Sequence, residues 1–218
     1  SELSGIGETF LPTDKLWYKK TFTIDRTWKG KNIILHFGAV DYRCEVFVDG
    51  KLAGMHTGGN NPFCFDITGL LKGNGEHTLI VSVTDPTDTD SVTRGKQILD
   101  PHGIWYTAVS GIWKSVWLEP VSATHIERIR HSADIAGGKA AFRLSLAASK
   151  GDETAVITVM DGGRRIAEAE GAASGEIVVK VPDAELWTPA SPKLYDIKVT
   201  LSRKGRVLDE ADSYFAMR

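Results

Sequence analysis

One short segment shows the pattern that recurs along the whole chain: Cys44-Glu45-Val46-Phe47-Val48-Asp49-Gly50. Cys44, Val46 and Val48 alternate with other residues, as expected for a strand with one buried face. Asp49 and Gly50 then tolerate the positive φ angles that a tight hairpin turn requires. The segment therefore predicts a β-strand that leads into a hairpin.

Similar runs flank this segment and are separated by turn residues. In the first part of the sequence they are residues 16–24, 32–37, 77–83 and 111–119, with another predicted turn at Gly73-Asn74-Gly75. No stretch carries a sustained 3.6-residue apolar stripe with a cap, so no helix longer than a turn or two is expected. Long loops and many aromatic residues favour a jelly-roll sandwich of about eight strands for this part.

The pattern changes after Glu119-Pro120-Val121, where a proline, which cannot donate in a ladder, marks the join. Plainer runs follow at residues 126–131, 140–147, 154–160, 176–181, 195–201 and 206–215, with turns at Asp161-Gly162-Gly163 and Lys204-Gly205. This spacing is typical of an immunoglobulin-like sandwich, which needs about 100 residues and about seven strands. We therefore predict an all-β chain of two domains, a jelly-roll sandwich over residues 1–120 and an immunoglobulin-like sandwich over residues 121–218.

Composition excludes several classes of partner. Apolar residues at 42% and charged residues at 25% predict a folded protein with a buried core. A formal charge of −2 with mixed signs offers no basic face to nucleic acid, and no run reaches the roughly 18 apolar residues of a membrane span. Residues 1–10 lack a charged start followed by an apolar stretch, so an export signal was either removed or never present. The first case implies a periplasmic or secreted protein and the second a cytoplasmic one.

The two cysteines and six histidines predict neither a metal site nor a cofactor. Cys44 shares strand parity with Val46, whereas Cys64 lies between Phe63 and Phe65, so the two sulfurs should point in opposite directions. We expect two thiols rather than a disulfide. The histidines show no metal-ligand spacing.

The segment from Thr84 to Thr107 breaks the regular strand spacing. Irregular loops longer than about 12 to 15 residues in a compact domain are usually functional or disordered, and the aromatic content here argues against disorder. We expect an ordered loop at one rim of the first sandwich. Asp85, Asp88 and Asp90 lack the ligand pattern of a calcium loop, so a solvated, turn-capping acidic segment is favoured.

Three groups of motifs extend across nearly the whole sequence. The first comprises residues 46–51, Gly54, His56, Gly58-Gly59, Pro62-Phe63 and residues 65–68. The second comprises residues 94–97, 103–107, 110–113 and 116–120. The third comprises residues 186–189, Ser191-Pro192 and Leu194-Tyr195. Together, and in this order, they resemble glycoside hydrolase family 2, the family of β-galactosidases, β-glucuronidases and β-mannosidases.

The resemblance implies a galactose-binding-like jelly roll and an immunoglobulin-like domain that precede a catalytic (β/α)8 barrel. A retaining glycosidase needs two carboxylates about 5 Å apart, and in this family both come from the barrel, which takes about 250 residues. None of the 28 acidic residues matches a family catalytic motif. We therefore expect no catalytic residue, and a non-catalytic N-terminal region whose partners are a carbohydrate, the missing barrel of the same polypeptide and a second copy in a homodimer. The alternative is a stand-alone carbohydrate-binding module.

Five residues of the irregular loop are candidate carbohydrate contacts: Arg94, Asp100, His102, Trp105 and Tyr106. The two aromatic rings could stack on a sugar, brace the loop against the barrel or simply pack inside the domain. The guanidinium, carboxylate and imidazole groups could bind neighbouring sugar hydroxyls or form an interface ion pair.

Trp113 and Trp117 lie four apart on one predicted strand, and Ile112, Val116 and Leu118 occupy its other face. Because both faces of this strand would be apolar, we expect core or inter-domain packing for the two tryptophans rather than ligand binding.

Overall fold

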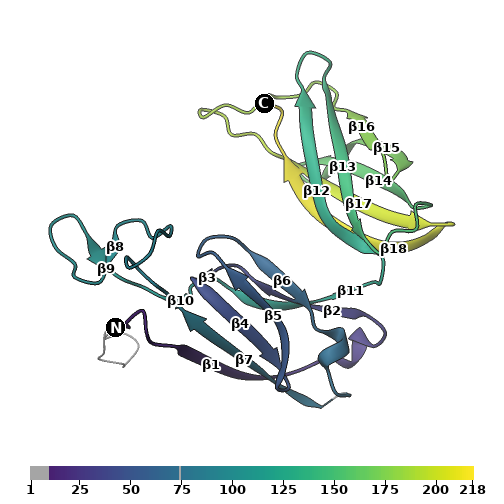
Figure 1. The fold of residues 1–218 in the computed structure, drawn as a ribbon. Coiled ribbons are helices and arrows are strands. Elements are labelled where there is room, and N and C mark those ends of the chain that lie inside the picture. The colour runs from purple at the N-terminus through teal and green to yellow at the C-terminus, as the bar shows by residue number, and fades with distance from the viewer. Residues whose placement is uncertain (1–9, 74) are drawn as a thin grey trace. The chain divides into compact units, whose positions relative to one another are not determined.

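The computed structural model describes residues 10–73 and 75–218, and its fold is all-β (Figure 1). Two predictions fall partly outside the described residues. Asn74 belongs to the predicted turn at residues 73–75, and residues 1–9 belong to the N-terminal stretch, residues 1–10, that lacks the pattern of an export signal. The described helices are two 3-10 turns, η2 (Arg26–Trp28) and η3 (Thr68–Leu70), as the sequence predicts. In the described part of the chain, no helix has the length and hydropathy needed to cross a membrane.

The chain divides into two compact units, Ser1–Pro120 (unit 1) and Val121–Arg218 (unit 2). Unit 1 contains a four-stranded antiparallel sheet in the order β1-β7-β4-β5 and a three-stranded sheet in the order β11-β2-β6. The strands of the first sheet are β1 (Leu16–Thr23), β7 (Glu76–Thr84), β4 (Arg43–Val48) and β5 (Lys51–Thr57). Those of the second are β11 (Val116–Val121), β2 (Asn32–Phe37) and β6 (Phe63–Asp66).

Unit 1 also contains two short strand pairs outside its main sheets. They are β3 (Val40–Asp41) with β10 (Gly111–Ile112), and β8 (Gln97–Ile98) with β9 (Tyr106–Thr107). The β8–β9 pair is parallel, whereas the β3–β10 pair is antiparallel.

The core of unit 1 lies between its two main sheets. Ile33, Leu35 and Phe37 of β2 are buried together with Val46 of β4 and Val81 of β7. The two sulfurs point in opposite directions, as predicted: Cys44 is buried in this core and Cys64 is exposed on β6. Burial raises the pKa of the Cys44 thiol to about 11, so this thiol stays protonated at neutral pH.

Unit 2 is a sandwich of seven strands, the number predicted for an immunoglobulin-like domain. One sheet contains β12 (His125–Asp134), β13 (Lys139–Ala147) and β16 (Glu176–Lys180). The other has the order β15-β14-β17-β18, with β15 (Arg164–Ala172), β14 (Thr154–Asp161), β17 (Tyr195–Arg203) and β18 (Arg206–Phe215). Phe142, Ile157, Val199 and Phe215 are fully or almost fully buried between the two sheets.

The hairpin predicted from the opening segment forms. Asp49 (φ 50°) and Gly50 (φ 77°) connect β4 to β5, and Val48 pairs with Lys51 across the turn. Two consecutive positive φ angles are the signature of a type I′ turn, whose twist matches that of the strands. The hairpins at residues 162–163 and 204–205 in unit 2 also have two consecutive positive φ angles.

The second strand of this hairpin, β5, was not among the strands predicted from alternation. An aromatic ring packs against it. A Cβ on Gly54 would lie 2.2 Å from the ring of Phe65, so the strand needs a glycine at the position where that ring packs. A glycine interrupts the alternating pattern by which a strand is recognised.

The prediction of one continuous strand over residues 111–119 is wrong. The chain leaves the β-ladder between β10 and β11, where the Gly38 N–H donates to the Ser115 carbonyl and Trp113 Nε1–H donates to the Gly59 carbonyl at 2.7 Å. Trp113 is 49% exposed and Trp117 46% exposed, so neither indole is in the core of unit 1. The alternation rule failed because it assumed that a single strand places both rings on one covered face.

Candidate functional site

The irregular loop between β7 and β10 is closed by one buried carboxylate. Asp85 is only 4% exposed, and it accepts the Thr87 N–H at 2.8 Å and the Ser110 hydroxyl at its other oxygen. Asp85 and Ser110 are the first and last residues of the loop, so a single side chain joins its two ends. Asp85 caps a turn, as predicted, but the prediction that it is solvated is wrong.

A second side chain links the two arms of the loop. The Gln97 amide oxygen accepts the Val109 N–H at 2.5 Å, and the Lys96 carbonyl accepts the Tyr106 N–H at 2.8 Å. These contacts flank the parallel β8–β9 pair, which projects from one end of unit 1 (Figure 1). The loop is thus held at its base by Asp85 and along its arms by Gln97.

Four of the five candidate residues lie at the tip of this loop, three in the turn that precedes β9 and Tyr106 at the start of that strand. His102 donates from Nδ1 to the Asp100 carbonyl at 2.7 Å, and the His102 carbonyl accepts the Trp105 N–H at 2.9 Å. Trp105 is half-buried, and Tyr106 is 65% exposed with the Lys96 ammonium 6.0 Å from its ring centroid. The tip therefore displays a carboxylate, an imidazole and two aromatic rings together.

Arg94 lies on the other arm of the loop. Its carbonyl accepts the Gln97 N–H at 3.2 Å, and its Nε is buried without a hydrogen-bond partner in the described part of the chain. Among the described residues no ion pair joins Arg94 to Asp100, or Asp100 to His102. Contact of these five residues with carbohydrate stays a prediction.

Asp41, at the base of the loop, was not among the candidate site residues predicted from the sequence. It pairs with Gly111 across β3 and β10, and a Cβ on Gly59 would lie 2.4 Å from its carboxylate oxygen. Burial, and secondly the charge of Asp85, raise the pKa of Asp41 to about 6. A polar residue directly after the buried Val40 was the one signal in the sequence that could have indicated it.

Asp41 and Asp85 are the pair in unit 1 whose electrostatics most resemble those of a catalytic dyad. Glycosidases separate the pKa values of two carboxylates by burial and mutual repulsion. Both oxygens of Asp85 are already hydrogen-bonded, however, and its 4% exposure leaves no path for a sugar. The geometry indicates an anchor for the loop rather than an acid and a nucleophile.

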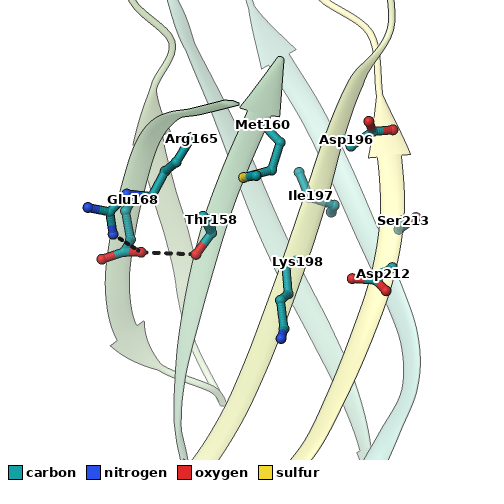
Figure 2. A pocket seen from close by; sticks show the side chains of 9 residues that line it. All are labelled: Thr158, Met160, Arg165, Glu168, Asp196, Ile197, Lys198, Asp212 and Ser213. Atoms are coloured by element: carbon teal, nitrogen blue, oxygen red, sulfur yellow. Dashed lines mark hydrogen bonds and ion pairs between the residues drawn. The ribbon is translucent and has the colours of Figure 1, made fainter. Parts of the chain in front are cut away.

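A shallow hollow in unit 2 offers the other group of carboxylates (Figure 2). It lies on the outer face of the β15-β14-β17-β18 sheet, and Arg165 and Thr158 both donate to Glu168, at 3.1 and 3.0 Å. Its lining residues are Thr158, Met160, Arg165, Glu168, Asp196, Ile197, Lys198, Asp212 and Ser213.

The carboxylates of this hollow are poorly suited to glycoside cleavage. Asp196 and Asp212 are exposed on an open sheet face, without the burial that keeps a glycosidase acid protonated at neutral pH. Residues 10–73 and 75–218 contain no group of three His, Cys, Asp or Glu side chains arranged to hold a metal ion.

Curated proteins are similar in sequence to most of this chain. A β-galactosidase from Thermoanaerobacter pseudethanolicus is 29% identical over 88% of this chain and 27% of its own length. A β-glucuronidase from Paenibacillus borealis is 25% identical over 85% of this chain and 33% of its own length. The chain spans about a fifth to a third of the length of the curated relatives it matches.

Solved structures show the same fold. The β-glucuronidase from Ruminococcus gnavus superposes with a TM-score of 0.76 at 23% identity, over 94% of this chain and 36% of that one. A β-glycosidase from Bacteroides vulgatus superposes with a TM-score of 0.72 at 25% identity, over 92% of this chain and 25% of that one.

Two family models account for nearly all of the sequence. Residues 6–121 match the sugar binding domain of glycosyl hydrolases family 2, and residues 124–218 match a second domain of glycosyl hydrolases family 2. With its jelly-roll sandwich and its seven-stranded second sandwich, the chain belongs to glycoside hydrolase family 2.

Proposed function

We propose that this chain is a non-catalytic region of a family 2 β-glycosidase, and that residues 85–110 form one wall of a sugar site completed by another domain of the same polypeptide. The observation that carries the proposal is the build of this loop. Asp85 and Gln97 hold about two dozen irregular residues in one conformation and display Trp105 and Tyr106 at the tip. An ordered loop of this length in a compact domain is typical of a binding function.

The non-catalytic part of the proposal follows from the carboxylates. Cleavage with retention needs an acid and a nucleophile about 5 Å apart and both open to the substrate. Asp85 is closed off beside Asp41, and Asp196 and Asp212 lie exposed on a sheet face. The reacting groups therefore come from outside this chain, which fits its limited coverage of longer relatives.

The substrate is proposed to be a β-glycoside of a hexose or hexuronic acid. The relatives that share this chain are β-galactosidases and β-glucuronidases. At the loop tip, Asp100 and His102 provide hydrogen-bonding groups for sugar hydroxyls, and Trp105 provides an apolar surface for a C–H face. A homodimer that buries further surface of either unit stays a prediction.

The test is steady-state kinetics on the longest polypeptide that contains this chain. Trp105→Ala should lower kcat/KM for an aryl β-glycoside about tenfold, because the loss of one stacking contact corresponds to roughly 1.4 kcal/mol. Trp17→Ala is the matched control, since Trp17 is 61% exposed on β1, outside the loop.

Two results would contradict the proposal. An unchanged kcat/KM in Trp105→Ala would remove the loop from the sugar site. If the chain alone binds oligosaccharide with an affinity that Trp105→Ala abolishes without unfolding it, the stand-alone carbohydrate-binding module becomes the better description.

A further inference from the structure

The outer face of the β11-β2-β6 sheet carries a second aromatic surface, which the loop does not use. Trp117 of β11 stacks on His36 of β2, with ring centroids 4.8 Å apart and planes inclined by 5°. His36 Nε2 lies 2.8 Å from Glu119 Oε2, two residues beyond Trp117 on the same strand. Because alternate residues share one face of a strand, Trp117 and Glu119 point away from the core together.

The indole of Trp117 has one open face. The imidazole covers one side of the ring, yet the residue remains 46% exposed. The other exposed aromatic rings of unit 1 are partly covered by lysine ammonium groups: Lys15 lies 5.5 Å from the centroid of Trp17, Lys96 6.0 Å from that of Tyr106 and Lys114 4.7 Å from that of Trp113. No cation lies over Trp117 in the described part of the chain, so a flat apolar surface is available there.

The neighbours of Trp117 make this surface small and polar at its edges. Across β2 and β6, His36 pairs with Cys64 and Ile34 pairs with Asp66. Ile34 is 8% exposed and Asp66 is exposed, so Trp117 is the large exposed apolar side chain among the described residues of this face. A stable protein interface buries about 800 Å² on each partner, whereas one indole matches the C–H face of a single pyranose ring.

The charges on this face select between sugars. The Glu119 side chain is 52% exposed and uses one oxygen for His36, so its other oxygen can accept a hydrogen bond from a sugar hydroxyl. The same carboxylate repels the carboxylate of a uronic acid and the phosphates of a nucleotide. A neutral sugar with equatorial hydroxyls, which leave its C–H face open, fits both the ring and the charges.

We propose that Trp117, His36 and Glu119 form a second carbohydrate-binding surface, separate from the loop, for a neutral β-linked oligosaccharide. The His36 ring supports one face of the indole, and the Glu119 carboxylate fixes the orientation of the imidazole. Trp117 stacks on one sugar ring, while Glu119 accepts from a hydroxyl of that ring or of its neighbour.

The test is calorimetric titration of the 218-residue chain with cellotetraose, together with its uronate counterpart, a β-1,4-linked tetraglucuronate. We expect cellotetraose to bind and tetraglucuronate not to bind. Trp117→Ala should weaken binding about tenfold, and Trp117→Phe by less because it keeps a ring. Trp17→Ala and Trp105→Ala should leave cellotetraose affinity unchanged, which separates this surface from the loop. Glu119→Gln should allow tetraglucuronate to bind.

Three contrary outcomes overturn this inference, and the first two leave the role proposed for the loop untouched. The first is the absence of binding heat with cellotetraose at its solubility limit. The second is a cellotetraose affinity that survives Trp117→Ala in a chain with unchanged circular dichroism. The third is a cellotetraose affinity that is lost in Trp105→Ala rather than in Trp117→Ala. If sedimentation shows an oligomer that Trp117→Ala converts to a monomer, the face is a protein interface and the sugar proposal fails.

Discussion

Asp85 in unit 1 and Glu153 in unit 2 are both buried carboxylates that organise a loop, but their surroundings are opposite. Glu153, at 3% exposure, accepts from the Ser149 hydroxyl and from two backbone N–H groups in a tight turn, and it forms an ion pair with Arg203. Asp85, at 4% exposure, accepts from neutral donors only, spans about two dozen residues and has another acid, Asp41, beside it.

This difference shows where each unit is rigid. A cation and three hydrogen bonds stabilise the charge of Glu153, and its pKa is lowered to about 2, first by the Lys150 N–H and also by Arg203 and Ser149. Among the described residues no cation pairs with Asp85, and its charge adds to the effect of burial in raising the pKa of its neighbour Asp41. We expect unit 2 to be a stable scaffold. The loop of unit 1 should be ordered but more mobile than unit 2. Four predictions test this contrast.

Glu153→Gln should have the largest effect. It removes the buried carboxylate that pairs with Arg203. Although the more exposed Asp152 still lies 2.8 Å from Arg203 Nε, breaking the buried ion pair costs about 3 kcal/mol in the free energy of unfolding. Because the pKa of Glu153 is depressed, its contribution is complete above its usual value of 4.5 and is lost as pH falls toward about 2. Urea denaturation at pH 7 and pH 3 measures both effects. A variant as stable as the parent at pH 7 would refute the scaffold role of this pair.

Asp85→Ala should cost about 2 kcal/mol, because it leaves the buried Thr87 N–H and the partly buried Ser110 hydroxyl without their acceptor. Hydrogen–deuterium exchange should rise throughout residues 96–109 while unit 2 is unchanged. Asp90→Ala is the control: Asp90 is exposed and caps only its neighbour Ser91. Equal exchange in the two variants would show that Asp85 does not close the loop.

Asp41→Asn should stabilise unit 1 at pH 7 by about 1 kcal/mol, a value reduced for the solvent screening of a half-exposed group. The unfolded chain loses this proton near pH 3.8 and the folded chain near 6, so the stability of the parent falls as pH rises between these values. The gain should therefore disappear below pH 4. In a carbon-13 titration of the parent, a midpoint for the Asp41 carboxyl near 4 would contradict the pKa raised by burial and by the charge of Asp85.

Glu176→Ala should have the smallest effect, below about 0.5 kcal/mol, because exposed ion pairs contribute little. Its partner Arg143 is 72% exposed, and the pair lies on β16 and β13 of unit 2. Thermal denaturation beside Glu153→Gln gives the comparison. A loss as large as that of Glu153→Gln would mean that burial does not decide which ion pairs stabilise unit 2.

The same contrast explains how much could be predicted from the sequence. Unit 2 consists of hairpins, so alternating residues and turn residues were enough to predict its fold class and most of its strands. In unit 1 the break in strand spacing identified the loop, and the chemistry of its side chains gave the candidate contacts. The contacts that hold the loop, from Asp85 to Ser110 and from Gln97 to Val109, join residues 25 and 12 positions apart and follow no local pattern. The core position expected for Trp113 and Trp117 was wrong because a break in the ladder leaves no alternation to detect, whereas their packing between domains stays a prediction.

The most direct measurement is hydrolysis of 4-nitrophenyl β-galactoside and β-glucuronide by the 218-residue chain alone. We predict no release of 4-nitrophenol above the buffer rate at any pH between 4 and 8. Turnover by this chain that disappears in Asp41→Asn or Asp85→Asn would place an acid and a nucleophile at the base of the loop, and would contradict the claim that this region binds sugar without cleaving it.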